Sequence, residues 1–350
     1  MRAHRLSPNF AAMALIPLLA LTACGSVKAT TDTKQGSGNT NKTLKPVTLM
    51  MNFTFSGHHS PVFYGVKKGI FKDLGIDLKI EPGGGSLKTV QAVGAGHADF
   101  GWSDAASIIT GIDAGVPVHA LGAFEQNSSS AVIFMADSGI QKPADLKGKS
   151  IGITPGDALS QTFPAFLAAN NMKKSDVTIV NVDAASKIAV LVKGTVDAMV
   201  GFEENQAPVV AQKSGKEVKT LLYSDYGVPF MGLGLFTSNG MIKNDPDLVS
   251  AMYKGIVASW TAAAADPNAA VDAIESAVGQ QLPTRDLLLT QLKHQIPLLH
   301  TKDRPDAPIG SNTTDEWRKT ITLLAEYGVI DKPGSPDLYW DSAFQPAAGS

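Results

Sequence analysis

The 350-residue chain contains a single cysteine and almost no arginine over most of its length. With Cys24 as the only cysteine, the chain cannot form an internal disulfide. No arginine occurs between Arg5 and Arg285, so this stretch lacks the side chain best suited to binding carboxylate or phosphate bidentately. The net charge of -2 argues against a nucleic-acid-binding or polybasic membrane surface.

The chain also lacks a convincing nucleotide or nucleophile motif. The order Gly148, Lys149, Ser150 matches the end of a phosphate-binding loop, but Pro143 occupies the position of its first glycine. Neither a Gly-x-Ser-x-Gly elbow nor a dinucleotide fingerprint is present. We therefore expect no cofactor. Asp104, Asp157 or Glu203 could act in acid–base chemistry, yet no nucleophile motif accompanies them.

The N-terminus has the features of an export signal. Arg2 and Arg5 precede an apolar run over residues 10–20 that is too short to span a membrane. The sequence Leu-Thr-Ala-Cys ending at Cys24 resembles a bacterial lipobox, which implies that this cysteine is lipidated; the alternative is a plain secretory signal with a chance cysteine. We expect residues 1–23 to be a lipoprotein signal peptide and residues 24–45 to hold the lipidated cysteine and a flexible, polar tether.

The remaining chain has the composition of a folded protein, with 44% hydrophobic and 18% charged residues. Short apolar runs that predict strands alternate with helical patterns, which favours an α/β fold with parallel or mixed sheets. The strands are expected at 47–55, 76–80, 116–124, 131–135, 150–154, 177–182, 218–223 and 233–236. From residue 247 onward the pattern is helical, with helices expected at 249–265, 269–278, 285–292 and 314–327.

Two stretches about a hundred residues apart share one pattern. Residues 96–107 and 194–205 each begin with a glycine that is expected to end a helix. A short buried strand and a loop with aromatic and acidic residues are expected to follow. Strands of open α/β sheets deliver their last residues to the carboxyl edge, where ligands bind. We therefore expect two lobes that present Trp102 with Asp104, and Phe202 with Glu203, to one shared ligand.

Other predicted strand ends precede helix starts, where backbone N–H groups and the helix dipole favour negative ligand atoms. Adjacent His58 and His59 raise a metal hypothesis with Asp104, but their spacing is not that of a known zinc site, so we assign no metal. Aromatic residues near these ends could stack on a planar ligand. The candidate ligand-binding residues are Phe55, Ser56, His58, His59, Tyr64, Ser86, Trp102, Asp104, Thr154, Asp157, Phe202, Glu203 and Glu204.

Four segments, 63–78, 94–101, 139–152 and 315–330, resemble extracytoplasmic solute-binding proteins of ABC importers. The resemblance is to the nitrate/sulfonate/taurine type, which includes binders of thiamine pyrimidine precursors. It implies a two-lobed clamshell of the type II periplasmic-binding-protein class, with two hinge crossings and a helical C-terminal segment. The expected boundaries are 46–125 with 231–350 for lobe I, and 126–230 for lobe II.

The resemblance also implies a function without catalysis. A monomer, lipid-anchored outside the bacterial cell membrane, would close on one small solute and deliver it to a permease driven by an ATPase. In the pyrimidine-precursor branch an acid and a tryptophan end the first strand, and an aspartate or glutamate lies in the second lobe. Here Phe53 and Thr54 or Phe55 occupy the first region, so its acid is missing, while Glu203 or Glu204 could be the acid of the second lobe.

The charges of the predicted site bear on the solute. An anion beside Asp104, Asp157 and Glu203 would meet like-charge repulsion of roughly several kcal/mol when the charges are close and partly desolvated. We therefore expect a neutral or cationic, planar, nitrogen-bearing solute. Three alternatives stay open: a sulfonate or nitrate binder, a pyrimidine-synthase-like enzyme of the same fold, and a sensor or surface interaction lipoprotein. The synthases carry a cysteine-rich motif that this chain lacks.

Overall fold

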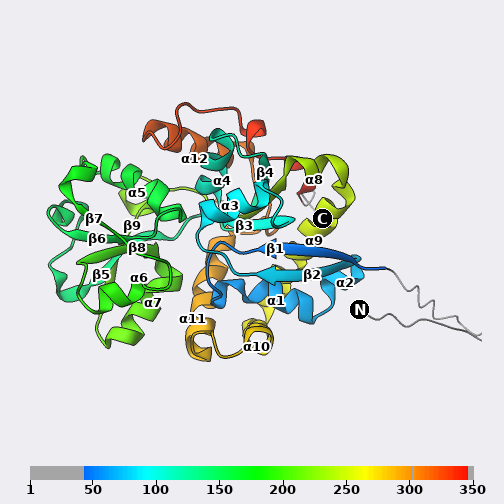
Figure 1. Ribbon diagram of the computed structural model, residues 1–350, viewed down its shortest axis with the longest axis horizontal. Helices are drawn as coiled ribbons and strands as arrows, with labels where there is room; N and C mark the ends of the chain where they lie inside the picture. The colour runs from blue at the N-terminus through cyan, green and yellow to red at the C-terminus, as the bar shows by residue number, and fades with distance from the viewer. Residues whose placement is uncertain (1–42, 302, 346–350) are drawn as a thin grey trace, which may run out of the picture. The chain divides into compact units, whose positions relative to one another are not determined.

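A computed structural model describes residues 43–301 and 303–345 (Figure 1). The predicted signal peptide, Cys24 and the tether up to residue 42 lie outside these residues, so the lipid anchor stays a prediction. Within the described ranges, no helix is both long enough and apolar enough to cross a bilayer.

The first sheet contains five strands, and all but one are parallel. β10 runs antiparallel to its neighbours β3 and β4, whereas β1 pairs in parallel with β2 and β3. The strand order is β2 (Ile76–Glu81), β1 (Lys45–Met50), β3 (Phe100–Asp104), β10 (Leu233–Ser238) and β4 (Val118–Ala123).

The second sheet repeats this plan with a different stretch of the chain. β5 runs antiparallel to β8 and β9, while β6 pairs in parallel with β7 and β8. The strand order is β7 (Thr178–Asn181), β6 (Ser150–Ile153), β8 (Ala198–Phe202), β5 (Ser130–Met135) and β9 (Val218–Leu222). The predicted mixed α/β architecture is confirmed.

Helices cover both faces of each sheet, as βα connections require. Those that follow strands of the first sheet are α1 (Ser60–Lys67), α2 (Ile70–Asp73), α3 (Ser86–Gly94) and α4 (Ala105–Asp113). Those of the second sheet are α5 (Ala158–Ala169), α6 (Lys187–Val192) and α7 (Glu203–Ser214). The C-terminal part holds α8 (Asn239–Asn244), α9 (Pro246–Ala265), α10 (Pro267–Val278), α11 (Arg285–Gln295) and α12 (Thr314–Glu326).

Alternation along the strands sorts apolar side chains onto opposite faces of each sheet. In β8, Val200 and Phe202 join a core with α5, whereas Met199 joins a separate core with α6 and α7. In β3, Phe100 and Trp102 point into a core with α1 and α9. Burial on both faces explains why these strands read as nearly continuous apolar runs.

Two segments connect the sheets and lie against each other. Residues 124–129 lead from β4 to β5, and residues 223–232 lead back from β9 to β10. The Ser128 N–H donates to the Phe230 carbonyl at 2.9 Å, and the Gly232 N–H donates to the Glu125 carbonyl at 3.0 Å. These paired segments lie where the sequence predicts two hinge crossings; the exact lobe boundaries stay a prediction.

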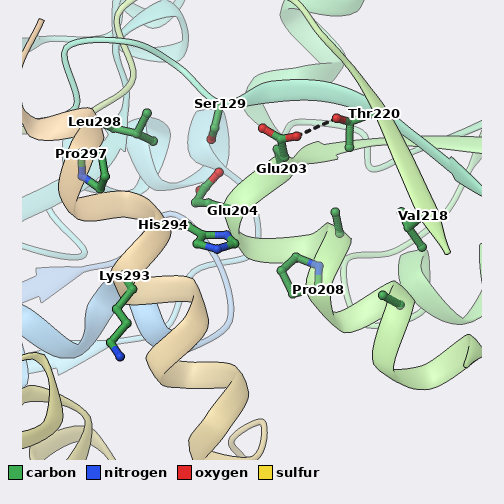
Figure 2. Close-up of a pocket in the computed structure, with 12 residues that line it drawn as sticks. Ser129, Glu203, Glu204, Pro208, Val218, Thr220, Lys293, His294, Pro297 and Leu298 are labelled. Carbon is green, nitrogen blue, oxygen red and sulfur yellow. Dashed lines mark hydrogen bonds between the residues drawn. The ribbon is translucent and has the colours of Figure 1, made fainter. Parts of the chain in front are cut away.

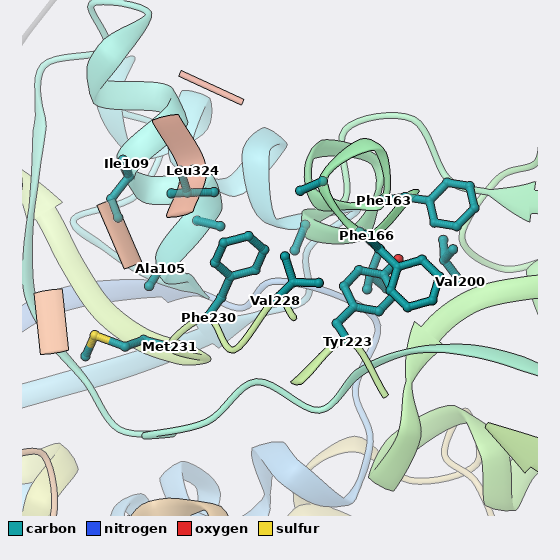
Figure 3. Close-up of a cluster of buried hydrophobic side chains, with 14 of the residues drawn as sticks. Ala105, Ile109, Phe163, Phe166, Val200, Tyr223, Val228, Phe230, Met231 and Leu324 are labelled. Carbon is teal, nitrogen blue, oxygen red and sulfur yellow. The ribbon is translucent and has the colours of Figure 1, made fainter. Parts of the chain in front are cut away.

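One apolar core passes from the first sheet to the second along the returning segment (Figure 3). Val228 and Phe230 of that segment pack between Ile109 of α4 and Leu324 of α12 on one side and Phe166 of α5 on the other. The connection between the sheets is therefore packed with side chains.

Three predicted boundaries near the candidate site are wrong. β1 ends at Met50, not at Phe55, so the turn after it begins earlier than the apolar run suggests. β3 includes Trp102 and Asp104, which the sequence places in a loop. α7 begins at Glu203, directly after β8, whereas the sequence places Glu203 in a loop. After β1 the apolar residues continue beyond the strand, and β3 and β8 pass into their helices with no intervening turn residue, so the pattern alone cannot locate these boundaries.

Candidate functional site

Strand ends of both sheets lead directly into helices, and two predicted acids cap those helices. An Asp104 carboxylate oxygen accepts from the Ala106 N–H at 2.9 Å at the start of α4. An Asp157 oxygen accepts from the Ser160 N–H at 2.7 Å at the start of α5. Aspartate is a favoured N-cap, so the local sequence explains both positions. Each cap leaves one carboxylate oxygen for other contacts.

A small cavity of about 10 Å³ lies between loops and helices of the two sheets, and we call it the central cavity. Its walls combine amides, one ion pair and two phenyl rings. Its lining residues are Asn52, Phe53, Ser86, Asp157, Leu159, Lys187, Phe202, Asn205 and Gln206. With room for about one water molecule, the central cavity is closed around its polar groups.

Direct contacts between the two halves close the central cavity. The Leu87 N–H of α3 donates to the Gly156 carbonyl before α5 at 3.1 Å. Gln291 of α11 bridges both sides: its carbonyl oxygen accepts from the Gly57 N–H at 2.8 Å, and its amide donates to the Asn205 carbonyl at 2.8 Å. A closed cleft with specific hydrogen bonds across it is therefore the conformation described.

A buried ion pair occupies one wall of the central cavity. The Lys187 ammonium donates to the second Asp157 oxygen at 2.8 Å, and the two side chains are only 1% and 6% exposed. The same ammonium lies 5.6 Å from the centre of the Phe53 ring. Lys187 is absent from the predicted site residues, and the expected repulsion treats Asp157 as an unpaired charge. The predicted repulsion of an anion at Asp157 is wrong to that extent.

His58 and His59 are buried at the edge of the first sheet and bonded to neighbours. Ser56 Oγ lies 2.9 Å from His58 Nδ1, and His59 Nε2 lies 3.0 Å from the side-chain Oδ1 of Asn52. Burial lowers the pKa of His58 to about 3, and burial together with His58 lowers the pKa of His59. Both imidazoles are neutral at pH 7 and can donate or accept. Within the described residues, no three potential metal ligands converge on one point.

The Asp104 carboxyl is also held in a nonpolar setting. Burial, with a smaller contribution from nearby Asp157, raises its pKa to about 7 against the opposing effect of the Ala106 and Ser107 N–H groups. Near neutral pH this carboxyl can therefore either accept or donate a hydrogen bond.

Several buried polar atoms from both sheets have no hydrogen-bond partner among residues 43–301 and 303–345. They include Nε2 of His58, Oγ1 of Thr154 at the end of β6, and the hydroxyl of Tyr223 after β9. Each of these residues is at most 2% exposed. Buried polar groups are normally paired, so unpaired atoms after strands of both sheets are typical of a site that receives polar atoms from a bound molecule, although none of these three residues lines the central cavity.

Glu203 and Glu204 lie at a different place from the central cavity. Both line a larger pocket of about 570 Å³, here called the side pocket, together with residues of β9 and α11 (Figure 2). A Glu203 oxygen accepts from the Thr220 hydroxyl at 2.7 Å. The structure therefore brings Ser86, Asp157 and Phe202 to the central cavity and places both glutamates in the side pocket.

The other predicted aromatic residues pack within the first half of the protein. Trp102 is 1% exposed and stacks on Trp260 with ring centres 6.1 Å apart. Phe55 and Tyr64 pack against the same core, and neither lines the central cavity. The rings that line it are Phe53 and Phe202. A correct end for β1 would have pointed to Asn52 and Phe53, because both follow that strand directly; Lys187, Asn205 and Gln206 carry no comparable local signal.

Comparison with known proteins identifies related sequences and folds. The sequence profile of the family described as NMT1/THI5 like matches residues 56–270. The formylaminopyrimidine-binding protein of Halalkalibacterium halodurans is 21% identical over 91% of this chain and 94% of its own length. The 4-amino-5-hydroxymethyl-2-methylpyrimidine phosphate synthase of Uromyces fabae is 24% identical over 63% of this chain and 67% of its length.

Among solved structures, the alkanesulfonate-binding protein SsuA from Xanthomonas axonopodis pv. citri, bound to MOPS, aligns with a TM-score of 0.67. It is 14% identical, and the alignment covers 85% of this chain and 98% of the other. At this identity the likeness concerns the fold alone: two α/β lobes of the periplasmic-binding-protein type.

Proposed function

This chain belongs to the NMT1/THI5-like family, and on that premise we propose that it is the solute-binding component of an ABC import system. It captures one small solute between its two lobes and delivers it to a membrane permease with an associated ATPase. The proposal includes lipid anchoring through Cys24 outside the cell membrane, a monomeric state, and lobes at 46–125 with 231–350 and at 126–230.

The observation that carries the proposal is the set of unpaired buried polar atoms that follow strands of both sheets. His58 belongs to the first half of the protein, and Thr154 and Tyr223 belong to the second. A solute that pairs with atoms of both halves favours the closed conformation over the open one, because only closure brings the two sets together. Coupling of solute binding to closure is what a carrier protein needs.

For the solute itself we propose a small, planar, nitrogen-bearing molecule without a net negative charge, around which the cleft must be wider than in the structure, because the central cavity has room for about one water molecule. The amide N–H groups of Asn52 and Asn205 offer donors, since their side-chain oxygens already pair with His59 and Gln291, and the phenyl rings of Phe53 and Phe202 offer flat apolar surface. The Asp104 carboxyl does not line the central cavity, but its pKa near 7 suits ring nitrogens and amino groups in either protonation state once the cleft is wider. A relative that matches 91% of the chain is named for binding formylaminopyrimidine.

Lys187 favours a second candidate, a sulfonate-type anion. Its ammonium lines the central cavity, and an anion could share it with Asp157 while accepting from N–H groups at the start of α3. SsuA has the same fold and binds alkanesulfonates. The planar solute remains our first proposal because Lys187 is already neutralised by Asp157 at 2.8 Å.

We propose no catalytic turnover. The synthase of Uromyces fabae matches a smaller share of this chain than the binding protein does, 63% against 91%. Incubation of the protein with each ligand that it binds, followed by mass spectrometry of the solution, tests this directly. Conversion of a ligand to a new product would favour the synthase-like alternative.

Two measurements test the carrier proposal with the full chain in detergent. Native mass spectrometry identifies small molecules that co-purify with the protein, and calorimetry compares aminopyrimidines with taurine and nitrate. We expect aminopyrimidine binding that weakens tenfold or more in Asn52→Ala, about 1.4 kcal/mol, while exposed Asn244→Ala binds as the unaltered protein does. Tight binding of taurine or nitrate with no response to N-heterocycles would refute the planar solute in favour of the anion.

A further inference from the structure

The side pocket lies beside the central cavity and shares no lining residue with it. Its volume of about 570 Å³ is in the range of small-molecule sites. The walls are mostly apolar and come from α7, β9 and the end of α11, with Pro208, Val218 and Leu298 among them (Figure 2). The polar end is formed by Ser129 and Glu204.

Two buried atoms at this polar end lack a well-formed hydrogen bond among the described residues. Oε2 of Glu204 and Oγ of Ser129 have no partner of normal geometry, although the residues are only 4% and 5% exposed; the Ser129 hydroxyl lies near Glu204 and lowers its pKa. Neighbouring Glu203 differs, because its oxygen accepts from the Thr220 hydroxyl. An unpaired buried carboxylate oxygen loses its hydration without compensation. Both residues line the side pocket, so a molecule that enters it meets the side of this carboxyl and this hydroxyl.

A second buried carboxyl, Glu125, lies close to Glu204 and increases the need for positive charge. Its oxygens accept from the Leu233 N–H at 3.1 Å and from the Gln295 amide. Burial, together with nearby Glu204 and Asp104, raises the pKa of Glu125 to about 8 against the opposing hydrogen bonds from Leu233 and Gln295. Burial likewise raises the pKa of Glu204 to about 7. At neutral pH the two carboxyls hold protons unless a cation replaces them.

Within the described residues, no basic side chain forms an ion pair with either carboxyl. Lys293 and His294 of α11 are the basic groups on the wall of the side pocket. The Lys293 ammonium points away from Glu204, whereas the His294 ring lies beside it (Figure 2). Glu203 is the remaining charged group on this wall. The polar end of the pocket thus holds two buried carboxyls that have no ion-pair partner among the described residues, with the His294 ring beside Glu204.

We propose that the side pocket is a second binding site, which takes a small primary amine with an apolar body. The ammonium donates to Oε2 of Glu204 and Oγ of Ser129, and the hydrocarbon part packs on Pro208, Val218 and Leu298. A primary ammonium suits this end because it is compact, positively charged and carries three donors. Its positive charge replaces a proton on the carboxyl pair, so binding releases protons to solution.

The test uses the full chain and n-butylamine as the probe, with n-butanol and butyrate as controls of similar apolar size. Saturation-transfer NMR reports binding, and a pH-stat measures protons released. We expect butylamine to bind at least tenfold more tightly than butanol or butyrate. The expected release is close to one proton per amine at pH 6 and falls as the pH rises above 8, because the carboxyls are then already ionised. Equal binding of the three probes, or binding without proton release, overturns the proposal.

Variants separate this site from the central cavity. Glu204→Gln should weaken amine binding at least tenfold. Glu217→Gln removes the same charge at an exposed position and should leave amine binding unchanged. Ala207→Phe should block the side pocket without changing any charge, which covers the case in which Glu204→Gln fails to fold. Asn52→Ala should weaken binding of the solute in the central cavity and leave butylamine binding intact. If Glu204→Gln and Ala207→Phe both fold and bind butylamine normally, the amine site is wrong, whatever the central cavity binds.

Discussion

The buried pair of Lys187 and Asp157 offers the sharpest test of the closed site. Lys187→Met removes the ammonium and keeps most of the apolar volume. Asp157 then stays as a carboxylate that is 4% exposed and has lost the one ion pair that it forms among the described residues. Removal of one partner from a buried ion pair costs about 3–5 kcal/mol, so we expect the free energy of unfolding to fall by that amount at pH 7.

The second variant in this test, Asp157→Asn, retains the helix cap. An asparagine oxygen can still accept from the Ser160 N–H, as the aspartate does at 2.7 Å. The double variant carries neither buried charge and keeps both side-chain volumes. Replacement of a buried pair by uncharged groups of similar size is often close to neutral. We therefore expect the double variant to be more stable than Lys187→Met alone.

Urea unfolding followed by tryptophan fluorescence measures all four proteins of the cycle. The predicted signature is a favourable coupling of at least about 2 kcal/mol between Lys187 and Asp157, which is within the range measured for contacting residues. If Lys187→Met unfolds within about 0.5 kcal/mol of the unaltered protein, a size typical of surface changes, the pair does not form in solution and the assignment of the central cavity wall fails.

Three further changes probe the site and its support. Trp102→Ala should lower the free energy of unfolding by about 3–5 kcal/mol, because it empties a packed core; a normal urea midpoint would contradict that position. Gly85→Ala should weaken solute binding by tenfold or more in calorimetry, since its φ is +135° and a Cβ would lie 2.8 Å from the Gly156 carbonyl oxygen. Gly69→Ala, with φ +79° and open space, is the control, and equal binding by both variants would count against closure at this contact. Asp104→Asn should flatten the pH dependence of stability: with its pKa raised from 3.8 to about 7, Asp104 stabilises the fold below pH 4 and loses that contribution as the pH rises through 7. Identical urea midpoints against pH for both proteins would contradict this.

The arrangement of strands could be predicted from the sequence because apolar runs and turn residues are local signals. The strands around Ile76, Ser150 and Val218 lie where their patterns place them. Their ends are harder to predict. In residues 51–55 apolar side chains continue past the last strand hydrogen bond, since Met51 and Phe55 both pack on the core of the first sheet. Burial alone does not require strand geometry.

The candidate site was predictable only in part, for a related reason. Ser86 and Asp157 begin helices after strands, and that position can be read from the chain. Lys187 begins a helix thirty residues after its partner, and nothing near it in the sequence indicates burial. For Trp102, the predicted position near a strand end is correct, but the direction of its side chain could not be predicted. Side chains alternate between the two faces of β3, and this alternation directs the Trp102 ring toward Trp260.

The position of β10 between β3 and β4 has a consequence for synthesis of the protein. β10 spans Leu233–Ser238, whereas its neighbours are made more than a hundred residues earlier. Until the ribosome has produced the entire second sheet, β3 and β4 each present an unpaired edge made of apolar residues. Such edges associate readily with other strands. The nascent chain must therefore remain protected from aggregation until β10 is made, and it completes its first sheet last.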